Sequence, residues 1–271
     1  MRSCTGAPGS ARWERSGPEV GGPLDLLTAQ ALTILLVFAR IGTALMFLPG
    51  FGESFIPTRV RLLFAMSLAF AFHLLVPIGP EVGRGVTGLI GPLALEVTIG
   101  AWIGLTARIL MTALQFAGYQ IGMVSGLSNA FAPDSAAFQG GTILSSALLL
   151  SGVAVIFATD FHHLMIDALL MSYEVFPVGS IIPGDLAEQV VKAAGASVYV
   201  GVSLSAPFLV LTLLLNLAMG LANRMMPTMP VFFVASPILI GFVLLVMAIS
   251  VPSLLRGFLS FLADWFGSFT F

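Results

Sequence analysis

The chain has 271 residues, of which 58% are hydrophobic and only 9% are charged, and its formal net charge is −2. An ordinary soluble domain carries about 25% charged residues, and a soluble chain of this length could not hide so much apolar surface in one core. The composition therefore predicts a membrane protein. The lack of net positive charge argues against binding to nucleic acid through its phosphates.

The first 22 residues differ from the rest because they mix charged side chains with Gly, Ser and Pro. They are predicted to be a disordered leader, and residues 23–271 are predicted to form a single membrane domain. The apolar run that follows, Leu24–Leu48, is too long for the core of a cleaved signal peptide. The single cysteine, Cys4, can form no internal disulfide.

Hydrophobic segments follow one another along the remaining chain, and most are long enough to cross a bilayer. Six are predicted, at Leu24–Leu48, Arg61–Val76, Leu89–Leu127, Thr142–Met171, Val190–Leu221 and Val231–Phe258. The first ends at Pro49-Gly50 and the second before Pro77. The third is long enough to cross a bilayer nearly twice, so it is either two helices or one long helix that bends.

These segments are apolar on all sides instead of alternating in polarity as the strands of a membrane barrel would. Their backbone groups must therefore be satisfied within helices. Pro207 and Pro237 each remove a helical hydrogen bond and are expected to kink their helices. The sequence thus predicts an all-α, polytopic helical membrane protein of about six hydrophobic segments.

Glycines recur at a spacing of four in the third segment, at Gly118, Gly122 and Gly126, and again at Gly100 and Gly104. This spacing places each set on one helix face, where another backbone can approach closely. Two interpretations remain open, namely ordinary packing within the chain and a face for neighbouring subunits.

The connection between the third and fourth segments is nearly uncharged, which is unusual for a loop unless it is buried. It is either a re-entrant turn packed on its own bundle or a plug inside a pore. The residues assigned to the plug are Ser128, Asn129, Phe131, Pro133, Asp134, Phe138 and Gln139.

Ionisable groups inside hydrophobic segments suggest function by default. Those singled out are Glu96, Asp160, His162, His163 and Asp167. A proton relay, a metal pair and hydrogen bonds across subunits are all considered, but the patch offers too few ligands for a metal, so no metal is expected. Arg40 and Arg224 lie toward segment ends, where long side chains can snorkel to the interface.

Motifs for catalysis are missing from the sequence. Met123 stands where a serine protease motif around Ser125 would need glycine, and no phosphate-binding glycine loop with a following lysine occurs. The chain is therefore predicted to be no enzyme and to need no cofactor.

Short motifs spread along the chain carry a family resemblance. They are Arg40, Pro49-Gly50-Phe51-Gly52-Glu53, Ile56-Pro57-Thr58-Arg59-Val60-Arg61, Glu96, Gly100, Gly104, Gln115, Gly118, Ile121, Gly126, Asp160-Phe161-His162-His163, Ser172, Pro177-Val178-Gly179, Pro207, Asn216, Gly220, Arg224, Pro227 and Phe232. In this order and spacing, the chain from Leu24 onward resembles the FliR family, whose injectisome counterpart is SctT.

The resemblance implies a non-enzymatic subunit of a type III export gate in the bacterial inner membrane, at the flagellar basal body. FliP-like and FliQ-like subunits and an FlhB-like switch protein would be its partners, and unfolded export substrates would pass through the shared pore. The loop from Ser128 to Gln139 would then be the plug. Two features depart from the family pattern, namely the order Pro133-Asp134 and the run Thr228-Met229-Pro230.

Three other functions are considered. The same family pattern fits an injectisome SctT-type subunit, although the motifs resemble the flagellar branch of the family more closely. A proton-coupled transporter of small solutes would use Glu96, Asp160 and His162 as an ion site, although the segments show no evident inverted repeat. A structural assembly factor without a gating role is the third.

Overall fold

The computed structural model describes residues 23–76, 86–126, 143–178, 183–225 and 231–267. Within these ranges the protein has seven α-helices and no strand. The all-α prediction is therefore confirmed. The predicted leader, residues 1–22, lies outside the described residues.

The helices follow the predicted hydrophobic segments in order, with one segment divided in two, while α7 begins earlier and α8 ends later than predicted. Their bounds are Pro23–Phe47 for α1, Thr58–Phe72 for α2, Val86–Val124 for α3, Ile143–Ala158 for α5, Phe161–Val175 for α6, Pro183–Met225 for α7 and Val231–Gly267 for α8.

Four helices are long and apolar enough to cross a membrane, namely α1, α3, α7 and α8, and the bent pair α5–α6 adds a fifth candidate. The helix α2 has only 15 residues, which is short of the roughly 20 that a membrane crossing needs. The third predicted segment is one continuous helix of 39 residues, which settles the choice left open by the sequence. At 1.5 Å per residue α3 is about 58 Å long.

The fourth predicted segment is not a single helix, and this is a correction to the sequence analysis. It breaks between α5 and α6 with a bend of 78°. Asp160 at the break has a φ of 56°, the only positive φ of a non-glycine residue in the described ranges. A left-handed residue cannot continue a right-handed helix, so α5 ends before Asp160 and α6 starts after it.

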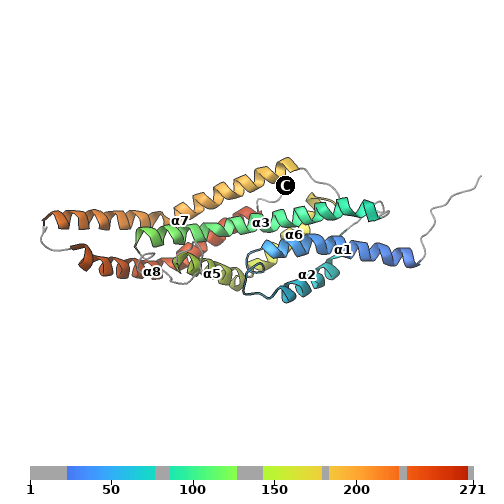
Figure 1. Cartoon of the computed structure of the whole chain (residues 1–271), viewed down its shortest axis with the longest axis horizontal. Helices are drawn as coiled ribbons and strands as arrows, with labels where there is room; N and C mark the ends of the chain where they lie inside the picture. The colour runs from blue at the N-terminus through green and yellow to red at the C-terminus, as the bar shows by residue number, and fades with distance from the viewer. Residues whose placement is uncertain (1–22, 77–85, 127–142, 179–182, 226–230, 268–271) are drawn as a thin grey trace, which may run out of the picture.

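The long helix α3 is the centre of the bundle, with α1, α5 and α7 packed along it. The main hydrophobic core, which includes Leu110, Ile156 and Phe258, joins α3 to α5, α6, α7 and α8. A smaller core around Ile41 and Ala69 joins α1 to α2. Figure 1 shows the resulting elongated molecule, in which most helices run along the long axis.

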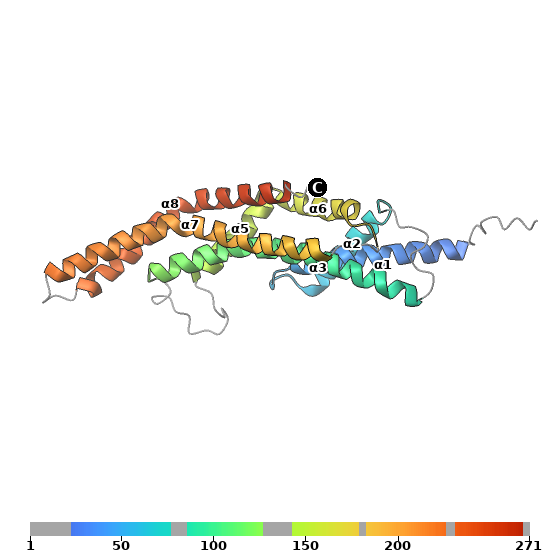
Figure 2. The same cartoon turned by 90° about the horizontal axis from the view of Figure 1, so that it is seen from above.

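The helices α7 and α8 form a hairpin that extends beyond the other helices at one end of the molecule (Figures 1 and 2). Pro207 lies within α7, and Pro237 and Pro252 lie within α8. Both helices change direction along their length in Figure 2, as expected where proline removes a backbone hydrogen bond. The end of α8 packs against α6, where the ring centres of Phe161 and Phe266 are 5.8 Å apart.

Three of the five predicted packing glycines face helices of the same chain. A Cβ atom at Gly104 would lie 2.5 Å from the Ala44 carbonyl oxygen of α1, and one at Gly100 would overlap the backbone of α1. At Gly118, a Cβ atom would lie 2.6 Å from the Ser145 Cα atom of α5. These close approaches are therefore occupied within the chain.

The other two glycines differ from each other in their surroundings. Gly122 is buried, and Gly126 has a φ of +76° with open space around its Cα atom. The predicted contact of these two glycines with neighbouring subunits stays a prediction.

Replacing Gly118 with Leu should destabilise the protein by about 1–3 kcal/mol, because the new side chain would force α5 away from α3. The measurement is thermal unfolding of the purified protein in detergent. Gly220→Leu is the matched control, since nothing lies within 4 Å of a Cβ atom there. Equal melting temperatures for the two variants would contradict the close packing of α3 on α5.

Candidate functional site

Arg40 of α1 and Glu96 of α3 form an ion pair in the interior of the protein. The Nε atom of Arg40 lies 2.6 Å from Oε2 of Glu96, and its Nη2 atom donates to Oε1 at 3.0 Å. Both side chains are fully buried. The two parallel hydrogen bonds make this a bidentate pair, the strongest arrangement of arginine and carboxylate.

The remaining N–H groups of Arg40 bind the carboxyl end of α6. Nη1 donates to the carbonyl oxygen of Ser172 at 3.0 Å and to its Oγ atom at 3.2 Å. Nη2 donates to the carbonyl oxygen of Phe176 at 2.9 Å. All five donors of the guanidinium are thus used, and its carbon lies 3.9 Å from the centre of the Tyr173 ring. A helix end carries unpaired carbonyls and partial negative charge, which a cation stabilises.

The snorkelling predicted for Arg40 is wrong. The side chain is fully buried because it finds five acceptors on α3 and α6. The sequence analysis named Arg40 and Glu96 separately and did not pair them, since they are 56 positions apart. The signal was the presence of opposite charges in two apolar segments, because each charge needs a partner in a low-dielectric interior.

Two of the family-like motifs meet at the bend between α5 and α6. The turn after α1 contains Gly50, whose φ of +86° suits glycine, and a Cβ atom there would lie 2.6 Å from the Phe157 ring. The rings of Phe51 and Phe157 pack edge to face, with their centres 5.5 Å apart. The turn thus supports the end of α5, just before Asp160.

Asp160, His162 and His163 come together at this bend, with their metal-binding atoms all within 4.8 Å of one another. The two imidazole rings are 4.1 Å apart. Asp160 and His163 are exposed, and three ligands are one short of a closed tetrahedral set. Asp167, one turn further along α6, is also exposed. The arrangement is a polar surface at the helix break.

The other family-like residues occupy helix ends and a kink. Pro57 precedes α2, and Arg59 is exposed while Arg61 donates to the Glu53 carbonyl oxygen at 2.9 Å. Pro207 lies within α7. Arg224 is exposed in the last turn of α7, and the snorkelling of its side chain to the membrane interface stays a prediction. The predicted plug residues Ser128, Asn129, Phe131, Pro133, Asp134, Phe138 and Gln139, and also Pro227, lie outside the described residues.

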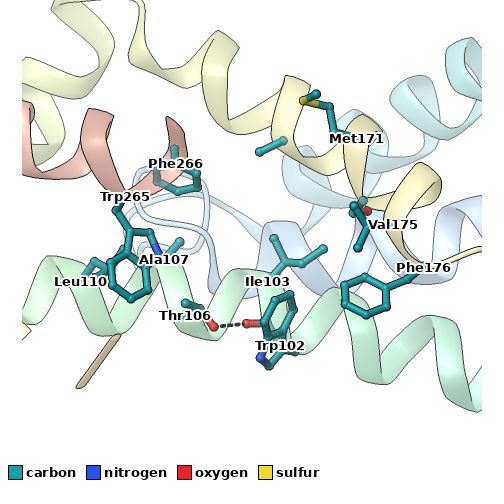
Figure 3. A pocket seen from close by; sticks show the side chains of 12 residues that line it. Trp102, Ile103, Thr106, Ala107, Leu110, Met171, Val175, Phe176, Trp265 and Phe266 are labelled. Atoms are coloured by element: carbon teal, nitrogen blue, oxygen red, sulfur yellow. Dashed lines mark hydrogen bonds between the residues drawn. The ribbon is translucent and has the colours of Figure 1, made fainter. Parts of the chain in front are cut away.

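An apolar pocket lies beside the Arg40 network, between α3, α6 and α8. Figure 3 shows Trp102, Phe176 and Trp265 around it. Its volume is about 70 Å³, far below the roughly 300–1,000 Å³ of ligand pockets. The Nε1 atom of Trp102 donates to the Leu186 carbonyl oxygen of α7 at 2.9 Å. The pocket is therefore a small gap in the packing of α3, α6 and α8, and the Trp102 hydrogen bond joins α3 to α7 beside it.

A second hollow is larger and more polar. It has a volume of about 850 Å³ and lies between α3, α5, α7 and the turn after α1. The side chains that line it include Arg108, Thr112, Gln115, Tyr119, Ser145, Ser146 and Ser197. We call it the polar groove. The sequence analysis did not foresee that hydroxyl groups from three helices would gather around Arg108.

Replacing Glu96 with Leu should destabilise the protein by about 3–5 kcal/mol, because the charge of Arg40 would stay buried without its partner. The double change Arg40→Met with Glu96→Leu should recover much of this loss, since no charge is then buried. Thermal unfolding in detergent of the parent, both single variants and the double variant forms a double-mutant cycle. A Glu96→Leu protein as stable as the parent would contradict the assigned role of the pair.

Comparison with known proteins identifies the family of the chain. Residues 31–265 match the family model of bacterial export proteins, family 1. The flagellar biosynthetic protein FliR of Caulobacter vibrioides is 39% identical over 226 residues, which are 82% of this chain and 90% of the relative.

More distant relatives carry the same name. FliR of Aquifex aeolicus is 29% identical over 254 residues, covering 92% of this chain and 97% of the relative. FliR of Escherichia coli is 28% identical over 225 residues, which cover 81% of this chain and 82% of the relative. With the family model matched along most of its length, the chain belongs to the FliR family of bacterial export proteins.

Proposed function

We propose that this chain is the subunit of a flagellar protein export gate that forms, with FliP-like and FliQ-like subunits, a pore for unfolded substrates in the bacterial inner membrane. The observation that carries the proposal is the match of residues 31–265 to the bacterial export family. Since the relatives are named as flagellar proteins, the flagellar system is favoured over an injectisome. An FlhB-like protein is a further proposed partner.

The geometry supports a protein that is covered by other subunits. Exposed apolar side chains continue along α7 from Val191, 71% exposed, to Met225, 81% exposed. These residues are separated by about 51 Å along the helix, whereas the hydrocarbon core of a bilayer is about 30 Å thick. Even a helix tilted by about 40° would leave part of this surface outside the lipid. Partner subunits must cover that part.

The proposed role is mechanical, without catalysis. Residues 128–139 would close the pore at rest and move aside when a substrate passes. The energy for transport would come from other components of the apparatus. The ion pair of Arg40 and Glu96 would hold α1, α3 and α6 as one rigid body around the moving parts.

Replacing residues 128–139 with a Gly-Ser linker of equal length should raise ion leakage through cells, because the linker cannot fill the pore. The measurement is growth and membrane potential in cells that overproduce the complete gate. The same linker in place of residues 5–16, within the predicted leader, is the control. Leakage at the parental level would show that this loop is not the plug.

Replacing Gly122 with Leu should reduce co-purification of FliP-like and FliQ-like subunits, because the larger side chain would separate neighbouring backbones. Gly220→Leu serves as the control. Thermal unfolding of the isolated chain distinguishes the two uses of this glycine. A loss of stability without partners present would instead assign Gly122 to packing within the chain.

A further inference from the structure

Asp160, His162 and His163 form a compact group at the break between α5 and α6, which we call the bend cluster. Their metal-binding atoms lie within 4.8 Å of one another, whereas two ligand atoms on one tetrahedral zinc ion are about 3.4 Å apart. Asp160 and His163 are exposed, so their side chains have room to rotate toward a shared ion. Small side-chain rotations would therefore bring the three ligand atoms to the spacing that a metal requires.

Polar groups of the bend cluster lack partners. Asp160 stands at the N-cap position of α6, yet its carboxylate makes no capping hydrogen bond, and within the described residues no ion pair includes it. The Nδ1 atom of His162 is buried and has no hydrogen-bond partner among those residues. An unpaired buried nitrogen costs free energy, and so does an unpaired carboxylate within an apolar segment. One cation held between these side chains would satisfy both.

The chemistry of the donors selects the ion. Two imidazole nitrogens and one carboxylate oxygen suit zinc and similar first-row divalent metals, whereas Mg²⁺ and Ca²⁺ prefer oxygen ligands alone. The sequence analysis expected no metal because a closed structural site takes four protein ligands. An open zinc site takes three, with water or another group in the fourth position. The bend cluster has the ligand number of an open site.

We infer that the bend cluster binds one zinc ion or a similar divalent metal, and that the ion pins the bend between α5 and α6. Asp160 precedes α6 while both histidines lie in its first turn, so a shared ion fixes the start of α6 to the break. The ring centre of His162 also lies 5.2 Å from that of Phe157 in α5, which extends the constraint to α5. The carboxylate of Asp160 offsets the partial positive charge at the amino end of α6. This inference goes beyond the proposed function and does not depend on it.

Zinc binding by the full chain, purified in detergent, tests the inference. The affinity tag contains no histidine, and Cys4 is changed to Ser to remove the only cysteine. Two variants each delete one ligand, namely His163→Ala and Asp160→Gly. Both should keep the fold, because alanine favours a helix at the exposed position 163 and glycine adopts the left-handed conformation of residue 160 without strain. The matched control is His73→Ala, which removes the one histidine outside the cluster.

Isothermal titration calorimetry with zinc chloride should show one ion bound per chain by the parent and by His73→Ala. The two ligand variants should bind at least about tenfold more weakly, because each keeps only two of the three ligands. Zinc should also raise the melting temperature of the parent and of His73→Ala, but not that of the ligand variants. Equal affinities in all four proteins would mean an adventitious ion only and would overturn the site. A parent that binds no zinc would overturn it as well.

Discussion

The buried pair of Arg40 and Glu96 is the interaction on which the arrangement of the helices depends. Two charges in an apolar interior are tolerated only when each hydrogen bond is made, and Arg40 makes all of its five with α3 and the end of α6. This requirement fixes α1 against α3 and brings the end of α6 to the same point. The short helix α6 can therefore be held at 78° to α5, although its own length is far below a membrane crossing.

Much of the fold could be predicted from the sequence, because helices in an apolar chain must satisfy their own backbone. The bounds of α1 and α3 lie close to the predicted segments for that reason, whereas α8 continues past its predicted end at Phe258 to Gly267. The break at Asp160 was not predicted, because long apolar stretches lie on both sides of it and the sequence analysis placed Asp160, His162 and His163 inside one hydrophobic segment. The Arg40–Glu96 pair was also missed, because a contact between distant segments leaves no local pattern. The polar residues of α3 that line the groove, such as Arg108 and Gln115, can be seen in the sequence. The groove itself could not be predicted, because α5 and α7 form its other sides.

The surface of the chain is unusual for a protein that would act alone. Apolar side chains stay exposed along α7 from Val191 to Met225, and the α7–α8 hairpin extends beyond the other helices. The chain belongs to a family of membrane-embedded flagellar export components, and under the proposed function partner subunits would cover such surfaces. The exposed apolar side chains of α7 and the membership in the FliR family are thus both consistent with a membrane-embedded export component.

The most direct test of the central claim is the mass of the native assembly. The tagged chain is expressed with the FliP-like and FliQ-like proteins of the same genome, purified in detergent and examined by native mass spectrometry. We expect one copy of this chain in a stable complex with several copies of each partner. A monomer or homodimer of this chain, with both partners expressed but unbound, would contradict the account.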